Sequence, residues 1–334
     1  MTSAGCCRPR QSRGNSRAEM FAYYLHDFDP FIFHIWGDFG PRWYGMAYVL
    51  AFACGFWLLR VLAQRGYTQL PVEQAGDFIT WGALFGVMLG GRLGYVLFYR
   101  PDMLRDPLSV VRVWEGGMSS HGGMLGLIAF TFWYAWRHKL PWTNLGDNLV
   151  VVAPIGLFFG RCANFINGEL YGRVTTVPWA MLFPKELLES ENAAEAGRAL
   201  DAAQRIDPGL TTPEALVHGL HAQPQLREVL RPILTPRHPS QIYEALLEGV
   251  LLFTILWLVR TRTRQPDGVL TGLFFVCYAI FRIVVEYFRE PDASLIAGFT
   301  RGQFFSFFLI AIGLAFIITG KIRNVQSAPV LGAK

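Results

Sequence analysis

Charged side chains are scarce in this sequence, since Asp, Glu, Lys and Arg together make up only 16% of its 334 residues. Soluble globular domains carry about 25% charged residues, so the shortage excludes an ordinary soluble domain. Hydrophobic residues reach 52% and are concentrated in long runs. The composition therefore predicts an all-α polytopic membrane protein whose first partner is the bilayer.

Cysteine is also sparse, and its placement excludes two further classes of protein. Cys54, Cys162 and Cys277 lie inside apolar runs, and none of the five cysteines shows the spacing of a zinc site. Cys6 and Cys7 do not follow an apolar segment of the kind that precedes a lipidation site. We therefore expect no disulfide framework, no metal and no organic cofactor.

A repeated unit and a basic face are both missing. No internal or inverted repeat is visible, which argues against the symmetry typical of transporters. The net charge of +5 comes from Lys and Arg residues that lie between the apolar runs rather than on one surface. Flanking basic residues are typical of membrane proteins, so we do not expect nucleic-acid binding.

What the sequence does contain is a series of apolar runs that approach the length of a membrane span, which is about 20 helical residues. They cover residues 43–62, 78–98, 121–136, 149–166, 242–259, 270–287 and 304–319. The third, fourth and last runs are short, which leaves partial insertion open for them. We expect about seven transmembrane helices.

The polar segments give the domain organisation. An Arg-rich tail covers residues 1–20, and Met20 offers an alternative start. Residues 21–167 hold an N-terminal segment outside the cytoplasm and helices one to four, and residues 240–323 hold the last three helices. Residues 168–239 are polar and rich in proline, which predicts a small external head with a surface helix over residues 185–205. Residues 324–334 form a tail.

The loops predict an orientation, because cytoplasmic loops carry an excess of Lys and Arg. Without the first 19 residues, one side collects ten basic residues and the other six. The larger group is Arg60, Arg65, Arg137, Lys139, Arg260, Arg262, Arg264, Lys321, Arg323 and Lys334; the smaller is Arg42, Arg100, Arg105, Arg112, Arg289 and Arg301. We place the C-terminus in the cytoplasm and the N-terminus outside.

Four polar residues share one face at the sixth apolar run. Tyr278, Arg282 and Glu286 recur at every fourth position, and Arg289 follows three residues later. A charged group in hydrocarbon costs about 2.5 to 3.5 kcal/mol on insertion scales, so this face must look inward. Two interpretations stay open: an Arg282–Glu286 pair that joins helices, or an anion site in which Glu286 orients the guanidinium.

The fourth run ends in a cation, two amides and a carboxylate. Arg161, Asn164 and Asn167 recur at every third position, and Glu169 and Gly172 follow them. Arg161 is thus a second candidate cation for the cavity that Arg282 faces. Two guanidiniums from different helices, each able to form a bidentate fork, favour a phosphate ligand.

Two other features of the apolar runs have open interpretations. Arg92, in the middle of the second run, is either a third cation of the cavity or neutralised structurally. In the fourth run, Pro154, Gly156 and Gly160 predict a helix that deforms or is approached closely by a neighbour.

Glycines flank a single histidine at the start of the third run, within residues 116–123. Glycine backbone N–H groups and a helix N-terminus both favour anions. His121 is either a catalytic base or a hydrogen-bonded packing residue. Ser119 and Ser120 lack the surroundings of a serine nucleophile.

The fifth run begins with Ser240 as a helix cap, and Glu244 and Glu248 share one of its faces. Two carboxylates in an apolar helix predict pairing with one of the buried arginines. At the start of the first run, Tyr44 is either an interfacial aromatic residue or a hydroxyl that reaches a lipid headgroup.

Taken together, six segments closely resemble the prolipoprotein diacylglyceryl transferase family of the bacterial inner membrane. They are residues 42–45, 90–95, 116–123, 160–172, 237–244 and 281–292, and they occur in this order across residues 27–323. The resemblance implies seven helices, a periplasmic head and an active site toward the periplasm. It implies functional roles for His121, Arg161, Asn164, Glu169, Gly172, Tyr278, Arg282 and Glu286, and for Tyr44.

The implied activity is transfer of the sn-1,2-diacylglyceryl group of phosphatidylglycerol to the lipobox cysteine of a preprolipoprotein, with release of glycerol phosphate. The residues suit this chemistry, because a thiol must lose its proton and imidazole titrates near neutral pH. We assign the base to His121, with Glu169 and Tyr278 as alternatives, and the phosphate to Arg161 and Arg282. A transporter or channel and a lipid-binding scaffold are the competing interpretations.

Overall fold

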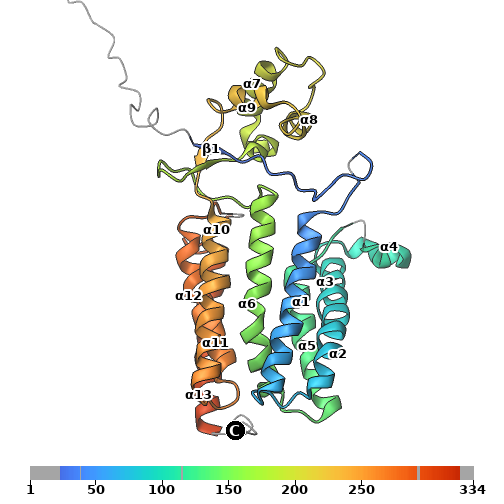
Figure 1. Ribbon diagram of the computed structural model, residues 1–334, viewed down its shortest axis with the longest axis vertical. Helices are drawn as coiled ribbons and strands as arrows, with labels where there is room; N and C mark the ends of the chain where they lie inside the picture. Colours follow the sequence, from blue (N-terminus) through green and yellow to red (C-terminus); the bar gives the residue numbers. More distant parts are fainter. Residues whose placement is uncertain (1–22, 38, 114–115, 292–293, 324–334) are drawn as a thin grey trace, which may run out of the picture. The chain divides into compact units, whose positions relative to one another are not determined.

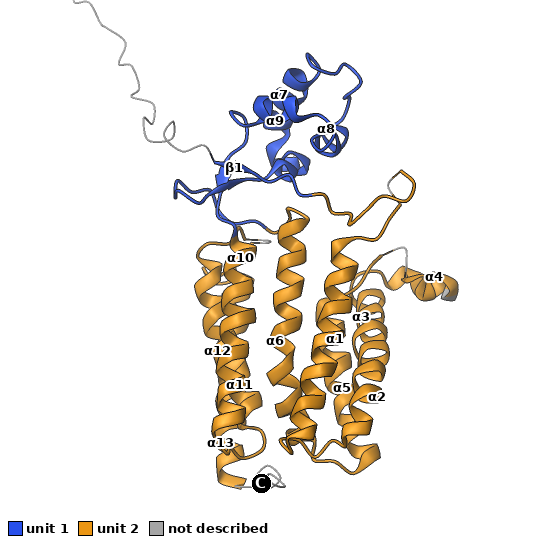
Figure 2. Cartoon of the chain, viewed as in Figure 1, with its two compact units in different colours: residues 1–28, 171–239 blue, residues 29–170, 240–334 orange. Residues whose placement is uncertain are grey.

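The structure is a computed structural model that describes residues 23–37, 39–113, 116–291 and 294–323. These residues form two compact units, shown in Figures 1 and 2. A helical unit comprises residues 29–170 and 240–323, and a head unit comprises residues 23–28 and 171–239. The predicted tails, residues 1–20 and 324–334, lie outside the described residues.

The helical unit is built mainly from long helices that run along one another (Figure 1). Its elements are α1 (Trp43–Gln64), η2 (Val72–Gln74), α2 (Ala75–Trp81), η3 (Gly82–Leu89), α3 (Gly90–Phe98), η4 (Pro101–Arg105), α4 (Pro107–Val111), α5 (Ser120–His138), α6 (Trp142–Ile166), α10 (Ser240–Glu244), η8 (Ala245–Leu251), α11 (Leu252–Arg262), α12 (Val269–Glu286) and α13 (Arg301–Arg323). η3 and η8 are π-helical turns inside longer helices. Such turns are rare and frequently mark functional sites.

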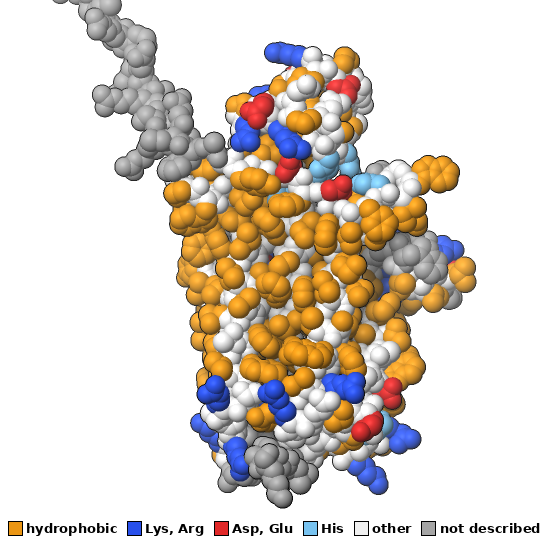
Figure 3. Space-filling model, viewed as in Figure 1, with side chains coloured by type: hydrophobic (Ala, Val, Ile, Leu, Met, Phe, Trp, Pro, Cys, Tyr) orange, Lys and Arg blue, Asp and Glu red, His pale blue; other side chains and the backbone are white. Residues whose placement is uncertain are grey.

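Six helical runs among the described residues are long and apolar enough to cross a bilayer, namely Trp43–Gln64, Val72–Phe98, Trp142–Ile166, Ser240–Arg262, Val269–Glu286 and Arg301–Arg323. Hydrophobic side chains cover the visible side of the helical unit, and Lys and Arg side chains gather at the end near the C-terminus (Figure 3). The chain is therefore an all-α polytopic membrane protein. The 19-residue α5 is not among the six runs, so the count of seven stays a prediction.

Helix α6 is longer than the apolar run that predicts it. The run begins at residue 149, whereas α6 begins at Trp142 and has 25 residues. Its first turns tolerate a buried carboxylate because Asp147 accepts hydrogen bonds of 2.8 Å from the backbone N–H groups of Gly268 and Thr271. The last helix, with 23 residues, is also longer than predicted. Partial insertion is thus not required by the length of either helix.

Close helix contact occurs at glycines other than the predicted ones. A Cβ atom on Gly156 or Gly160 would meet nothing within 4 Å, so the predicted close approach at these positions is wrong. One such contact lies between α3 and α5, where a Cβ on Gly122 would be 2.5 Å from Gly90 O and 2.8 Å from Gly94 Cα. Backbone therefore packs directly on backbone where α5 begins.

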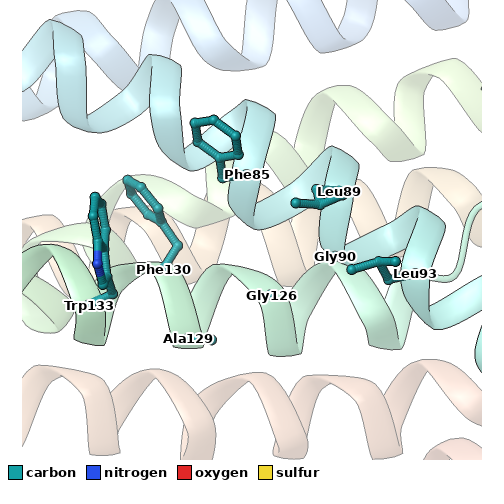
Figure 4. A pocket seen from close by; sticks show the side chains of 8 residues that line it. All are labelled: Phe85, Leu89, Gly90, Leu93, Gly126, Ala129, Phe130 and Trp133. Atoms are coloured by element: carbon teal, nitrogen blue, oxygen red, sulfur yellow. The ribbon is translucent and has the colours of Figure 1, made fainter. Parts of the chain in front are cut away.

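An apolar groove of about 520 Å³ opens beside this contact. Figure 4 shows its lining, which comprises Phe85, Leu89, Gly90, Leu93, Gly126, Ala129, Phe130 and Trp133. All of these residues belong to η3, α3 or α5. The groove is therefore an apolar feature on the surface of these helices.

The head unit combines short helices with a small sheet. Its elements are β1 (Tyr24–Leu25), β2 (Met181–Leu182), η6 (Pro184–Leu188), η7 (Ser190–Asn192), α7 (Ala193–Ala203), α8 (Pro213–Gly219), α9 (Pro224–Leu230) and β3 (Pro236–Arg237). β2 pairs in parallel with β1 and antiparallel with β3. The core consists largely of leucine and alanine side chains, including the fully buried Leu216, Leu226 and Leu230.

The head differs from the prediction in two respects. The composition of residues 185–205 predicts one surface helix, but the structure has the 3₁₀ turns η6 and η7 before α7. Helix α7 buries Ala196, Ala199 and Ala203 and exposes its opposite face. Residues 23–28 belong to this unit through the pairing of β1 with β2, a long-range contact that no local pattern reveals.

Candidate functional site

Three arginines converge on one buried carboxylate in the helical unit. Glu244, at the end of α10, is 0% exposed. Its Oε1 accepts hydrogen bonds from Arg282 Nη1 at 2.8 Å and from Arg289 Nη1 at 2.9 Å. Its Oε2 lies 3.0 Å from Arg161 Nε of α6. The pairing predicted for the carboxylates of this helix is therefore present, and it joins α6, α10 and α12.

Two further carboxylates complete the cluster. Glu248, in the π-helical turn η8, is fully buried and lies 3.5 Å from Arg282 Nη1 and 3.6 Å from Arg161 Nη2. Glu286 Oε1 lies 2.6 Å from Arg282 Nη2. Together with Arg289, the cluster contains three guanidiniums and three carboxylates. Its formal charge is zero, so these cations are held in a low-dielectric interior by charge compensation.

Helix α13 makes room for this cluster. A Cβ atom on Gly302 would lie 2.2 Å from Glu286 Oε1 and 3.1 Å from Arg282 Nε. Any larger residue at this position would displace the Arg282–Glu286 pair. Gly302 is therefore a residue of the site that no pattern in the sequence indicates.

The end of α6 supplies the amides and the fourth carboxylate. Asn164 Nδ2 donates to Glu169 Oε1 at 2.9 Å, and Arg161 Nη1 donates to Asn164 Oδ1 at 3.5 Å. Helix α6 ends because Gly168 adopts a left-handed conformation, with φ of +64°. Leu170 is also left-handed, with φ of +58°. This conformation costs about 1 to 3 kcal/mol in a residue with a side chain and is concentrated at functional sites.

The start of α10 is tied to the same segment. Ser240 Oγ donates to Leu170 O at 3.0 Å, and Gln241 Nε2 donates to Glu169 O at 2.7 Å. Gln241 is fully buried on the helix face that carries Glu244 and Glu248. Gln241 is absent from the predicted set of site residues, and Glu248 is predicted only as a partner of a buried arginine. Their spacing from Glu244, three residues before and four after, is the signal that identifies them.

Two tyrosines, Tyr278 and Tyr44, are also among the predicted site residues. Tyr278, one helical turn before Arg282, stacks on Phe274 with ring centroids 5.9 Å apart. Tyr44 is half-buried at the start of α1 and packs against Tyr48. Within the described residues, no hydrogen bond or ion pair joins Tyr44 or Tyr278 to the arginines.

His121 and Gly172 belong to other parts of the chain. His121 is the second residue of α5, and its side chain is exposed and makes no hydrogen bond or ion pair with any described residue. Ser119 caps this helix by accepting a 3.1 Å hydrogen bond from Gly122 N. Gly172 belongs to the head unit, where its N–H donates to His238 O at 2.8 Å. Burial lowers the pKa of the His238 side chain, which favours its neutral form.

Arg92 is neutralised structurally, which decides between its two interpretations. It is 3% exposed, and its five donors contact backbone carbonyl oxygens. These belong to Ser109 (2.6 Å), Val110 (2.9 Å), Arg112 (3.1 Å), Gly116 and Gly117 (3.0 Å). Ser119 N, which follows this loop, donates to Gly91 O at 2.9 Å. Arg92 thus fixes the loop that leads to His121 and is no third cation of the cluster.

The cluster presents guanidinium groups, which are suited to binding an anion. Among the described residues, no group of three or more His, Cys, Asp or Glu side chains is arranged to hold a metal ion. The Nη atoms of Arg161 contact other described residues only at long distances, 3.5 Å to Asn164 Oδ1 and 3.6 Å to Glu248 Oε2. These donors can therefore turn to a ligand without breaking a short hydrogen bond.

Comparison with known proteins shows which family this chain belongs to. The family model described as prolipoprotein diacylglyceryl transferase matches residues 30–319. A relative from Bdellovibrio bacteriovorus is 38% identical over 329 residues, covering 88% of this chain and 93% of its own length. One from Sodalis glossinidius is 41% identical over 315 residues, covering 92% and 99%. Both are named phosphatidylglycerol–prolipoprotein diacylglyceryl transferase. This chain therefore belongs to the prolipoprotein diacylglyceryl transferase family.

Proposed function

We propose that this protein transfers the sn-1,2-diacylglyceryl group of phosphatidylglycerol to the lipobox cysteine thiol of a preprolipoprotein. The carbon–oxygen bond between the diacylglyceryl group and the phosphate breaks, and a carbon–sulfur bond forms. Glycerol phosphate leaves with the electron pair of the broken bond, and the thiol proton passes to a base. The products are a thioether-linked lipid on the peptide and free glycerol phosphate.

The observation that carries this proposal is the convergence of Arg161, Arg282 and Arg289 on Glu244. As the carbon–oxygen bond breaks, negative charge accumulates on the phosphate. Guanidiniums that are already positioned bind this charge more tightly in the transition state than in the ground state. Arg161 and Arg282 are the proposed phosphate ligands, because the Nη atoms of both face the space around Glu248.

Proton removal is assigned to His121, whose imidazole is exposed at the start of α5. The loop that carries it is fixed by Arg92, so the side chain extends from a rigid support. Glu169 and Tyr278 are the alternative bases, and Glu169 already accepts a hydrogen bond from Asn164. The proposed substrate-binding residues are Tyr44, Asn164, Asn167, Gly172, Glu244, Glu286 and Arg289.

The proposed location is the bacterial inner membrane, with seven spanning helices. This proposal is supported by the excess of Lys and Arg in the loops predicted on one side of the membrane. The C-terminal end of α13, which carries Lys321 and Arg323, is predicted to lie on that same side. On this support we propose a cytoplasmic C-terminus. The arginine cluster would then lie toward the periplasm, since Glu286 ends α12 and Arg289 follows it, at the opposite end of the helix from Gly268.

The test is a direct assay of transfer. Purified protein is incubated with phosphatidylglycerol and a lipobox peptide, and the peptide is analysed by mass spectrometry. The expected result is a gain of one diacylglyceryl mass on the cysteine, which is absent when that cysteine is replaced by serine. A transporter or a lipid-binding scaffold would leave the peptide mass unchanged.

A further inference from the structure

Five buried side-chain oxygen atoms near the arginine cluster accept no hydrogen bond from any described residue. They are Asn167 Oδ1, Gln241 Oε1, Glu244 Oε2 and both carboxylate oxygens of Glu248. Glu244 and Glu248 have ion-pair contacts with Arg161 and Arg282, but the two amide oxygens have no such contact. Buried acceptors in proteins are nearly always hydrogen-bonded. The site thus offers amide acceptors to a ligand that carries donors.

The orientation of the Gln241 amide is fixed by its surroundings. Its Nε2 donates to Glu169 O at 2.7 Å. The reversed amide would place Oε1 against that carbonyl oxygen, so Nε2 must point toward Glu169. The side chain is fully buried, and Oε1 is left without a donor. Gln241 therefore presents an acceptor whose position and identity are both defined.

The acceptor Gln241 and the two carboxylates that contact the arginines occupy successive positions along one helix face. Gln241, Glu244 and Glu248 follow the spacing of three and four residues that aligns side chains on a helix. Glu244 holds the guanidiniums one turn from Gln241. Amide oxygens repel phosphate oxygens, so a phosphate would lie at the arginines. A headgroup with hydroxyl groups beyond its phosphate could bind both groups at once: the phosphate would contact the arginines, and a hydroxyl group would donate to Gln241.

We propose that Gln241 Oε1, together with Asn167 Oδ1, accepts hydrogen bonds from the hydroxyl groups of the lipid headgroup. These two amides then select a phospholipid that carries a polyol. This inference rests on the proposed function and assigns part of its substrate specificity. A headgroup without hydroxyl groups leaves both acceptors unpaired and is rejected, because buried polar groups that lose their partner discriminate strongly against the analogue.

The experiment compares two lipids that share the same reacting bond. One is phosphatidylglycerol, and the other is phosphatidylpropanol, in which a propyl group replaces the headgroup glycerol. For the wild-type protein, kcat/KM is expected to be at least about 10-fold higher with phosphatidylglycerol. Gln241→Met keeps the side-chain length and removes the acceptor, so the ratio of the two kcat/KM values should fall toward one.

Two further variants keep the test decisive. Ser240→Ala removes the neighbouring hydrogen bond to Leu170 O, so it should lower kcat/KM with both lipids equally and preserve the ratio. Asn167→Leu removes the second acceptor and should lower the ratio as well, which keeps the inference testable if Gln241→Met does not fold. A wild-type ratio in folded Gln241→Met, or in folded Asn167→Leu, would overturn the inference while transfer from phosphatidylglycerol stands. Absence of transfer by the wild-type protein from either lipid would remove the proposed function and this inference with it.

Discussion

The Glu244 carboxylate of α10 accepts a 2.8 Å hydrogen bond from the Arg282 guanidinium of α12. The same oxygen atom accepts a second one from Arg289, and the other lies beside Arg161. One fully buried carboxylate therefore sets the positions of three cations. If such a carboxylate is removed from an apolar interior, the positive charges that it compensates stay buried without a partner.

Glu244→Gln keeps the shape of the side chain and removes its charge. We expect destabilisation of about 3 to 5 kcal/mol, because one partner of a buried ion pair is lost, and a large loss of transfer activity. Thermal unfolding in detergent and the peptide mass assay measure the two effects. Glu195→Gln is the matched control: Glu195 pairs with the exposed Arg198 in the head unit, where such pairs contribute at most about 1 kcal/mol. Equal stability of both variants would contradict the role of Glu244.

Arg92→Lys replaces five donors in a planar group by three on one nitrogen atom. Several of the carbonyl oxygens at residues 109–117 would lose their partner, so we expect destabilisation of about 1 to 3 kcal/mol. Faster proteolysis within residues 100–118, with little change elsewhere, is the more specific observation. Arg105→Lys, on the exposed part of the same segment, should leave the cleavage pattern unchanged. An unchanged pattern in Arg92→Lys as well would show that the loop does not depend on this residue.

Gly122→Ala tests the backbone contact between α3 and α5. The added methyl group would lie 2.5 Å from Gly90 O, so the helices must separate. Overpacking of this kind costs about 1 to 3 kcal/mol, and the melting temperature should fall. Gly156→Ala introduces the same group where nothing lies within 4 Å, and alanine favours a helix over glycine by about 1 kcal/mol. Gly156→Ala should therefore be neutral or stabilising; a similar loss in both variants would speak against a specific contact.

His121→Gln tests the assignment of the base. A general base contributes about 10²- to 10⁴-fold to the rate, so kcat/KM should fall by that amount. The pH dependence of kcat/KM should also differ between the wild-type protein and the variant. The measurement is kcat/KM for phosphatidylglycerol between pH 5 and 9. If His121→Gln turns over at the wild-type rate across this range, His121 is not the base, and Glu169 and Tyr278 remain as candidates.

Much of the site could be predicted from the sequence because charged residues in apolar helices have few alternatives. Arg161, Arg282 and Glu286 stand out against their neighbours, and the need to compensate their charge points to Glu244. The seven apolar runs likewise locate the long helices of the helical unit. These signals are local, since each depends on spacing within one helix.

Other features depend on contacts between distant segments. The five carbonyl partners of Arg92 follow it by 17 to 25 residues, and no side-chain pattern marks a carbonyl as a partner. Gln241 is an ordinary polar residue at the start of a helix until its amide is seen against Glu169 O. The pairing of β1 with β2 spans 157 residues, from Tyr24 to Met181, and is equally invisible in local sequence.

The most direct test of the central claim is a comparison of Arg161→Lys, Arg282→Lys and the double variant with phosphatidylglycerol. Lysine keeps the charge but cannot form a bidentate fork. Each single variant should lose about 100-fold or more in kcat/KM, and the double variant should lose less than the product of the two, because both groups hold one phosphate. Arg100→Lys, in an exposed pair with Asp102, is the control and should retain wild-type activity. Near wild-type kcat/KM in either single variant, or fully multiplicative losses, would contradict a shared phosphate site.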